Sequence, residues 1–254
     1  MTQIGHASQD ESGRAVSGIA GDQTKREVLI QNWYSHPWHT VIRPKSAITA
    51  QTIANTMCKI CNNDNIGYDQ SQRTTLFEKA KAVKWNIDKI KTPCETDCSA
   101  TVCVCVNSAD ISIPSTMYTG NELKLLSDTG KFTILTDDKY TKSPAYLQVG
   151  DILLASGHTA VVVSCGDKVK PMVVARYIPS NYLAKFNKQY IVNRPVHIRT
   201  GAGKPKESLG VLAKGTKVRC YGKYSTFLKY KWLYVETTFK GITYIGFINK
   251  NYLS

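Results

Sequence analysis

The chain has 254 residues, of which 42% are hydrophobic and 20% charged, a composition that excludes a disordered or collagen-like protein. No apolar run is long enough for a membrane-spanning helix, and the first 13 residues lack the apolar segment of a secretory signal peptide. The net charge of +14 is uneven, since residues 178–254 carry a balance of +12 and residues 1–177 only +2. A basic module of this kind suits a polyanionic partner, such as nucleic acid or an anionic cell-wall polymer.

Helical patterns come first along the chain. Three stretches carry apolar residues at helical spacing: 27–34, 46–61 and 76–83. Ser46 is a candidate N-cap, and Thr119–Glu122 is a capping-box signature ahead of a leucine-rich stretch that Gly130 would end. Four later stretches are expected to be strands: 131–136, 149–155, 158–164 and 168–178. Turns are expected at Gly157 and 165–168, so helices followed by a short antiparallel sheet predict an α+β fold.

The last third of the chain has a different pattern. Residues 178–189, with Pro179 and two asparagines, are expected to form a linker. After it, short strand patterns alternate with frequent glycines, which is typical of a small β-barrel. The predicted organisation is a first domain at 1–177, a linker at 178–189 and a second domain at 190–254.

Among the eight cysteines, Cys98 has the most suggestive context. Asp97 can cap a helix beginning at Cys98, and the exposed N–H groups there stabilise a thiolate, lower its pKa and can hold an oxyanion. His158 starts an apolar strand directly after Gly157 and is the best candidate to shuttle the thiol proton. Each residue alone also fits a structural role, as a buried helix cysteine or a surface histidine, so the pair is the signal.

The surroundings of this pair resemble a known family. Asp97-Cys-Ser99 opening a helix, then Gly150-Asp-Ile-Leu153 and Gly157-His-Thr-Ala160, are similar to the papain-like NlpC/P60 and CHAP peptidoglycan hydrolases. Residues 7–13, 20–23 and 27–28 resemble the opening of phage-encoded cell-wall amidohydrolases. The resemblance implies a papain-like catalytic domain with helices packed on a short antiparallel sheet.

The basic tail resembles a bacterial SH3 domain on residues 196–203, 212–215, 246–253 and Trp232. This resemblance implies an all-β module that reads wall peptide or an anionic wall polymer. The candidate wall-binding residues are Tyr190, Arg199, Tyr224, Trp232 and Tyr252.

Together the two resemblances imply a phage endolysin of a Gram-positive host. Cys98 and His158 would hydrolyse an amide bond of peptidoglycan, with an N-acetylmuramoyl-L-alanine amidase favoured over a stem-peptide or cross-bridge endopeptidase. We expect a monomer without cofactor, made in the host cytoplasm without a signal peptide, that acts on the wall after release.

A third polar residue orients the histidine in related enzymes, and its place here is open. The residue opposite His158 in the expected hairpin is Ala175, which cannot serve. Asp22 and Gln23 are candidates from the N-terminal stretch, and Gln23 could instead donate to the oxyanion, as could the helix start at Asp97. A structural role for this loop fits the pattern as well.

Three other patterns have alternative interpretations. Cys58-x-x-Cys61 has zinc-like spacing, with Cys94 or Cys98 as further ligands, but lacks a second tight pair, so we expect no metal site. Residues 33–39, with two Trp and two His, could line a glycan groove or pack as core and loop, and His6 is ambiguous in the same way. The rival function is a non-catalytic nucleic-acid- or wall-binding protein, because tyrosines alternate with lysines between residues 221 and 234. We expect neither a nucleic-acid nor a membrane partner.

Overall fold

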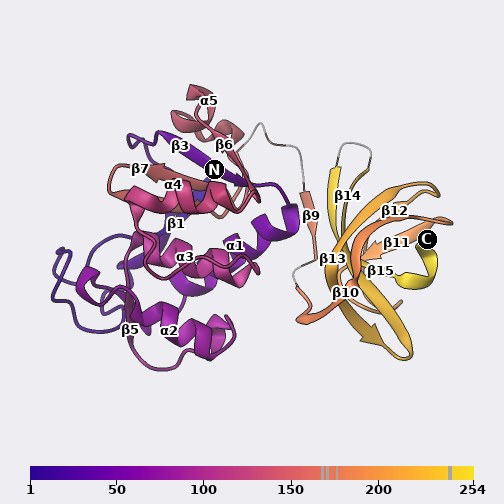
Figure 1. The fold of residues 1–254 in the computed structure, drawn as a ribbon, viewed down its shortest axis with the longest axis horizontal. Helices are drawn as coiled ribbons and strands as arrows, with labels where there is room; N and C mark the ends of the chain where they lie inside the picture. Colours follow the sequence, from indigo (N-terminus) through magenta and orange to yellow (C-terminus); the bar gives the residue numbers. More distant parts are fainter. Residues whose placement is uncertain (167–168, 170–171, 176, 240–241) are drawn as a thin grey trace. The chain divides into compact units, whose positions relative to one another are not determined.

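Two units divide the chain in the computed structural model, which describes residues 1–166, 169, 172–175, 177–239 and 242–254 (Figure 1). Unit 1 is Met1–Val169, drawn from indigo to magenta, and unit 2 is Lys170–Ser254, drawn from orange to yellow. Within the described residues, no helix has both the length and the apolar character needed to cross a membrane.

Unit 1 is built on a six-stranded antiparallel sheet with the order β2-β1-β8-β7-β3-β6. The strands are β1 (Gln3–Ala7), β2 (Val28–Asn32), β3 (Thr40–Pro44), β6 (Phe132–Leu135), β7 (Ile152–Ala155) and β8 (His158–Val162). Three of them precede the first helix, so the α+β class is correct but the expected order of helices before sheet is wrong. The stretch 27–34 is mostly strand β2 rather than helix, because it pairs with β1 over five residue pairs.

The helices of unit 1 are α1 (Ala47–Cys61), α2 (Thr75–Ala82), α3 (Cys98–Ser108), α4 (Thr119–Asp128) and α5 (Asp138–Thr141). A parallel pair, β4 (Ile66–Tyr68) and β5 (Cys94–Thr96), and three 3₁₀ turns (Gln70–Gln72, Ile87–Lys89, Pro144–Tyr146) complete the unit. The helices predicted at 46–61 and 76–83 are confirmed, and Ser46 caps α1 by accepting from the Thr49 N–H at 3.3 Å. The capping interaction of α4 lies one residue earlier than expected, because Asn121 Oδ1 accepts from the Tyr118 N–H at 2.8 Å.

Both faces of the sheet are buried, and this positions the site. On one face Val161 joins a core that includes Val102 of α3, and α3 packs directly against β8. On the opposite face Ala160 and Val162 pack with Trp38, which lies in the loop between β2 and β3. Since side chains alternate along a strand, β8 contributes to both cores. Gly157, the residue just before β8, lies against Cys98 at the start of α3.

Unit 2 is all β, as the sequence predicts for the last third. Its strands are β9 (Met172–Val174), β10 (Asn181–Ile191), β11 (Val196–Arg199), β12 (Ser208–Leu212), β13 (Lys217–Phe227), β14 (Tyr230–Phe239) and β15 (Ile242–Asn249), followed by a 3₁₀ turn at Lys250–Tyr252. The order is β10-β13-β14-β15-β11-β12, with β9 added in parallel to β15. Its own core includes Tyr190, Ile198, Leu233 and Ile248.

The expected linker is not a linker. Most of 178–189 forms β10, an edge strand paired with β13, and the chain divides at residues 169 and 170 instead. Along β10 only Phe186 and Tyr190 are buried, so its polar, exposed composition imitates that of a linker. Parts of the strand expected at 168–178 and of the turn expected at 165–168 lie outside the described residues.

Candidate active site

Cys98 is the first residue of α3, as the sequence predicts. Asp97 has an extended backbone, and its Oδ1 accepts from the Ala100 N–H at 2.7 Å, which satisfies one of the free donors at the helix start. The Cys98 Sγ lies 4.0 Å from the Gly157 carbonyl oxygen and also receives the backbone N–H of Thr159. The thiol therefore lies against the backbone on both sides of His158.

Arg73 fixes the start of α3 through Asp97. Its guanidinium binds both carboxylate oxygens of Asp97, and its Nη2 also donates to Ser99 Oγ at 2.8 Å and to the Met117 carbonyl at 2.6 Å. A planar guanidinium held by these acceptors has one orientation, so it aligns the loop before α3 with the segment before α4. Asp97 is thus engaged with Arg73 and the helix start rather than with His158.

His158 is held by a neighbouring strand. It is the first residue of β8, after Gly157, whose φ of +76° is the left-handed conformation that glycine tolerates. His158 Nε2 lies 3.0 Å from Nδ1 of His6 on β1, and His6 Nε2 lies 2.7 Å from Nε2 of the Gln31 side-chain amide on β2. Because β1 lies between β8 and β2, three adjacent strands supply a relay of polar side chains, which we call the histidine relay (Gln31, His6 and His158).

The direction of the protons in the histidine relay decides what His158 can do. In the orientation that the structure has, Gln31 Nε2–H donates to His6 Nε2, so Nδ1 of His6 carries a proton and donates to His158 Nε2, and His158 is protonated on Nδ1. When the amide is turned and its oxygen accepts from His6 Nε2–H, His158 donates from Nε2 and its Nδ1 is an unprotonated base. A half-turn of the Gln31 amide therefore decides whether Nδ1 of His158 is an unprotonated base or carries a proton.

Both histidines are neutral at pH 7. Burial, reinforced by neighbouring imidazoles, lowers the pKa of His6 and of His158 to about 4. The rings of His36 and Trp38 lie 5.7 and 5.8 Å from the His158 ring and close this side of the site. The residues at 33–39 thus form part of the site wall as well as part of the core.

The Cys98 thiol is neutral as well, which corrects the expectation of a lowered pKa. Burial, and then the charge of Asp97, raises the pKa of Cys98 to about 12, because the desolvation of a thiolate outweighs its stabilisation at the helix start. Within the described part of the chain, no hydrogen bond joins the Cys98 thiol to the His158 ring. In the resting site the thiol and the imidazole are therefore both neutral.

Tyr68 adds a proton donor near the thiol. It pairs with Thr96 across β4 and β5, two residues before Cys98. Burial, and then the nearness of Cys98, raises the pKa of the Tyr68 phenol to about 12, so it keeps its proton. Gln70 donates to the phenol oxygen at 3.0 Å, which leaves the Tyr68 O–H available as a donor.

A buried carboxyl group lies behind the thiol. Glu122 of α4 is 0% exposed, its Oε1 lies 2.8 Å from Thr159 Oγ1, and its Oε2 has no hydrogen-bond partner among the described residues. Burial, with a contribution from the charge of Asp97, raises the pKa of Glu122 to about 8, so at pH 7 it is mostly protonated. Glu122 thereby supports Thr159, whose own N–H meets the Cys98 sulfur.

The other candidates for the third polar residue lie elsewhere. Asp22 accepts from the backbone N–H groups of its own loop, at Thr24 and at residues 26–28. Gln23 is exposed, and its amide donates to the carbonyls of residues 19–21. Within the described residues neither side chain bonds to Cys98 or His158, and the hydrogen bonds of both stay within their own loop.

The residues that support the pair are not evident from the sequence. His6 has two interpretations in the sequence, and nothing in the sequence marks Gln31, Arg73 or Glu122, because each reaches the site only through contacts made in the folded chain. The one local cue is that His6 and Ile4 alternate with Gly5 and Ala7 on a short strand, which places His6 and Ile4 on the same face.

The zinc alternative finds no support in the geometry. Cys58 and Cys61 lie on α1, and burial raises the pKa of both thiols. In the part of the chain that the structure describes, no three His, Cys, Asp or Glu side chains are arranged to hold a metal ion.

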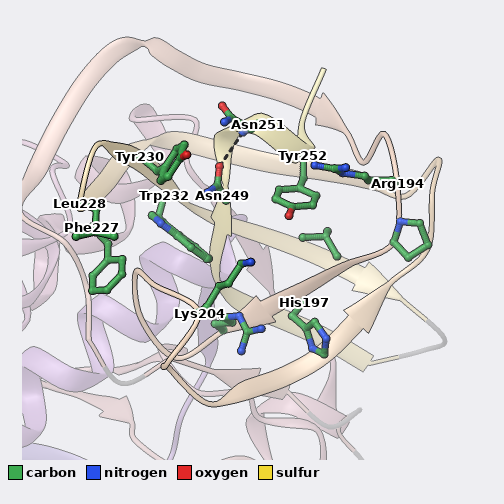
Figure 2. A pocket seen from close by; sticks show the side chains of 13 residues that line it. Arg194, His197, Lys204, Phe227, Leu228, Tyr230, Trp232, Asn249, Asn251 and Tyr252 are labelled. Carbon is green, nitrogen blue, oxygen red and sulfur yellow. Dashed lines mark hydrogen bonds between the residues drawn. The ribbon is translucent and has the colours of Figure 1, made fainter.

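Three of the five candidate wall-binding residues come together in unit 2. Arg199, Trp232 and Tyr252 line one pocket. Figure 2 shows Trp232 and Tyr252 there. Tyr190 is only 1% exposed and belongs to the core, which corrects its assignment as a contact residue. Tyr224 packs edge-on against Phe186, with ring centroids 5.4 Å apart, and does not line the pocket.

The comparison with protein families identifies unit 1. A family model described as an endolysin-like domain matches residues 4–169, which is more than half of the chain. The chain belongs to the endolysin-like domain family. Its membership indicates a lytic enzyme that acts on the peptidoglycan of the cell wall. No curated protein and no solved structure gives a significant match to the chain. The matched residues of this endolysin-like unit include Cys98, His158 and the whole histidine relay.

Proposed function

We propose that the endolysin-like unit is a cysteine peptidoglycan hydrolase of the NlpC/P60 or CHAP type, with Cys98 as nucleophile and His158 as general base. The observation that carries the proposal is the seating of the Cys98 thiol between the Gly157 carbonyl and the Thr159 N–H, on either side of a histidine held by its own relay. A nucleophile, a base and a third group that orients the base are the parts that thiol catalysis needs.

In the proposed reaction, both groups start neutral. His158 Nδ1 accepts the thiol proton as Cys98 Sγ bonds to the carbonyl carbon of the scissile amide. The charge pair thus forms only as the reaction proceeds, in a site that is largely closed to water. The imidazolium then gives its proton to the departing amine, the C–N bond breaks, and water hydrolyses the thioester with His158 again as base.

Two sets of donors suit the oxyanion that forms on the carbonyl. The first N–H groups of α3 point along the helix axis at the position of Cys98, where the helix dipole favours negative charge. The Tyr68 hydroxyl is a second donor, held by Gln70 and kept protonated by its raised pKa. Asp97 acts indirectly, by capping α3 and binding Arg73.

His6 is the orienting residue in this proposal, in place of Asp22 or Gln23. Its Nδ1 fixes the ring of His158 through Nε2, and Gln31 sets which nitrogen of His6 carries the proton. The productive form is the one in which the Gln31 amide has made a half-turn from its orientation in the structure and accepts, because that form leaves His158 Nδ1 free to take the thiol proton.

The substrate is an amide of peptidoglycan. Among these amides we place the muramoyl–alanine bond first, ahead of bonds within the stem peptide or the cross-bridge. We propose that the protein acts as a monomer, and that unit 2 is an SH3-like module that attaches it to the Gram-positive wall. The distribution of charge supports this division of roles. Residues 1–169 contain 17 basic and 17 acidic residues, whereas residues 170–254 contain 16 basic and 2 acidic ones, so the whole net charge of +14 lies in unit 2.

The test is hydrolysis of purified cell walls, with released fragments identified by mass spectrometry. Cys98→Ala should reduce the rate by about 10³-fold or more, whereas Cys58→Ala, at a half-buried thiol on α1, should not. Iodoacetamide should inactivate the enzyme and EDTA should not. Wild-type rates for Cys98→Ala would refute the thiol mechanism, and the new chain ends reveal which amide is cut.

A further inference from the structure

Unit 2 contains a pocket whose lining is unusual in charge. The pocket has a volume of about 550 Å³ and is formed by the segment around β11, the β13–β14 hairpin and the last residues of the chain (Figure 2). Arg194, Arg199 and Lys204 line it together with His197, and no carboxylate does. In the described part of the chain none of the three cations forms an ion pair. A concave site with several cations and no acid selects an anion.

The two arginines are held in place before any ligand arrives. The Arg194 guanidinium carbon lies 4.3 Å from the centroid of the Tyr252 ring, a cation–π contact that keeps the group over the ring. Arg199 donates from Nη1 to the Lys206 carbonyl at 2.7 Å, which leaves its other N–H groups for a ligand. Preorganised guanidinium groups lose less entropy on binding and match the oxygens of a phosphate group.

Trp232 provides a second indication of a bound ligand, one that does not depend on charge. Its side chain lines the pocket and is only 5% exposed, yet its indole Nε1–H has no hydrogen-bond partner among the described residues. Buried polar groups without a partner are rare in folded proteins, because leaving one unpaired is costly. An acceptor oxygen of a bound molecule would pair this donor.

The remaining lining favours a sugar or polyol beside the anion. Tyr230 and Tyr252 contribute aromatic rings, and Asn249 contributes an amide group to the same pocket. Aromatic faces pack on the C–H surfaces of such groups, while amides bond their hydroxyls. Three cations spread along β11 and its two flanking loops suit an anion that repeats along a chain better than the single carboxylate of a peptide end.

We infer that this pocket binds a phosphodiester-linked polyol or sugar polymer of the cell wall, with the phosphate at Arg194, Arg199 and Lys204 and an acceptor oxygen at Trp232 Nε1. The inference deepens the proposed function, because it names what unit 2 recognises. It rests on the proposal that the protein acts at the wall, but not on the catalytic role of Cys98.

The test measures binding of the full chain to a synthetic poly(glycerol phosphate) oligomer by titration calorimetry. Arg194→Gln should weaken binding at least tenfold, and Trp232→Phe, which keeps a ring but removes the N–H, at least threefold. Lys214→Gln, which removes one charge at an exposed position outside the pocket, is the matched control and should weaken binding less than twofold. Equal losses for Arg194→Gln and Lys214→Gln would overturn the inference, since charge alone would then explain binding.

Two further arms identify the ligand. Walls stripped of phosphodiester-linked polymer with hydrofluoric acid should retain at least tenfold less protein than untreated walls. Equal retention would instead indicate the peptide or glycan as ligand, and tighter binding to a single-stranded oligothymidine would indicate nucleic acid; either result overturns the inference. Cys98→Ala should bind the oligomer like the unmodified chain, so a failure of catalysis and a failure of this pocket are distinguishable.

Discussion

Glu122 gives the sharpest prediction, because its buried carboxyl should make unit 1 less stable as the pH rises. The group has an ordinary pKa of 4.5, which burial raises to about 8 in the folded chain. Below pH 4.5 the carboxyl is protonated in both the folded and the unfolded chain, so it does not lower the free energy of unfolding. Between pH 4.5 and 8 the unfolded chain ionises first, so the folded state loses stability steadily with increasing pH.

The magnitude follows from the size of this shift. Each unit of pKa difference corresponds to about 1.4 kcal/mol, so a change from 4.5 to about 8 amounts to about 5 kcal/mol in the free energy of unfolding. Glu122→Gln keeps the shape of the protonated acid but cannot ionise. The stability of the variant relative to wild type should therefore rise by about 5 kcal/mol between pH 4.5 and pH 8 and then level off.

Urea unfolding at half-unit pH steps measures this difference. In a Trp232→Phe background the remaining tryptophans, Trp33, Trp38 and Trp85, all lie in unit 1, so their fluorescence reports that unit alone. Glu78→Gln, at an exposed position of α2, is the matched surface change. If the stabilities of Glu122→Gln and the parent run parallel from pH 5 to 8, the carboxyl is not held neutral and the argument from its burial fails.

Three further predictions concern the site and the sheet. His6→Ala should lower kcat on soluble peptidoglycan fragments by about 10- to 100-fold with little change in KM, and an unchanged kcat would remove His6 from the proposed mechanism. Gly150→Ala should destabilise unit 1 by about 3 kcal/mol or more in urea unfolding, because the new Cβ would lie 2.3 Å from the Ala50 carbonyl oxygen. The control is Gly130→Ala, which is also at positive φ but has open space around it and should lower the free energy of unfolding by only about 1 kcal/mol. Alkylation of Cys98 by iodoacetamide, followed by peptide mapping, should accelerate up to and beyond pH 9, and a plateau at neutral pH would contradict its raised pKa of about 12.

The parts of the site that the sequence predicts are those with local causes. Asp97 caps the helix that begins at Cys98, and Gly157 makes the turn that starts the strand of His158, so both positions follow from neighbouring residues. His6 is different, because it meets His158 through strands whose residues lie 152 positions apart. No local pattern indicates such a pairing, so the sequence does not predict that His6 meets His158.

Burial explains the other differences between expectation and structure. The helix start at Cys98 predicts a low pKa only while the thiol is exposed, and the sequence does not reveal that the sheet covers it. In unit 2, Tyr190 and Trp232 both lie on strands and are equally plausible contact residues in the sequence. In the folded sheet Tyr190 packs in the core, whereas Trp232 lines the pocket.

The pairing of β1 with β8 also determines when the enzyme becomes active during its synthesis. Under the proposed mechanism, a nascent chain that has emerged only as far as β7 contains the nucleophile and the orienting histidine but no base. The base arrives with β8, which must insert between β1 and β7 and thereby completes the sheet. Such a long-range strand pairing forms late, because the loop that it closes spans most of the unit. Assembly of the sheet and assembly of the histidine relay are therefore one event, and under the proposed mechanism a chain that ends before β8 cannot cleave peptidoglycan.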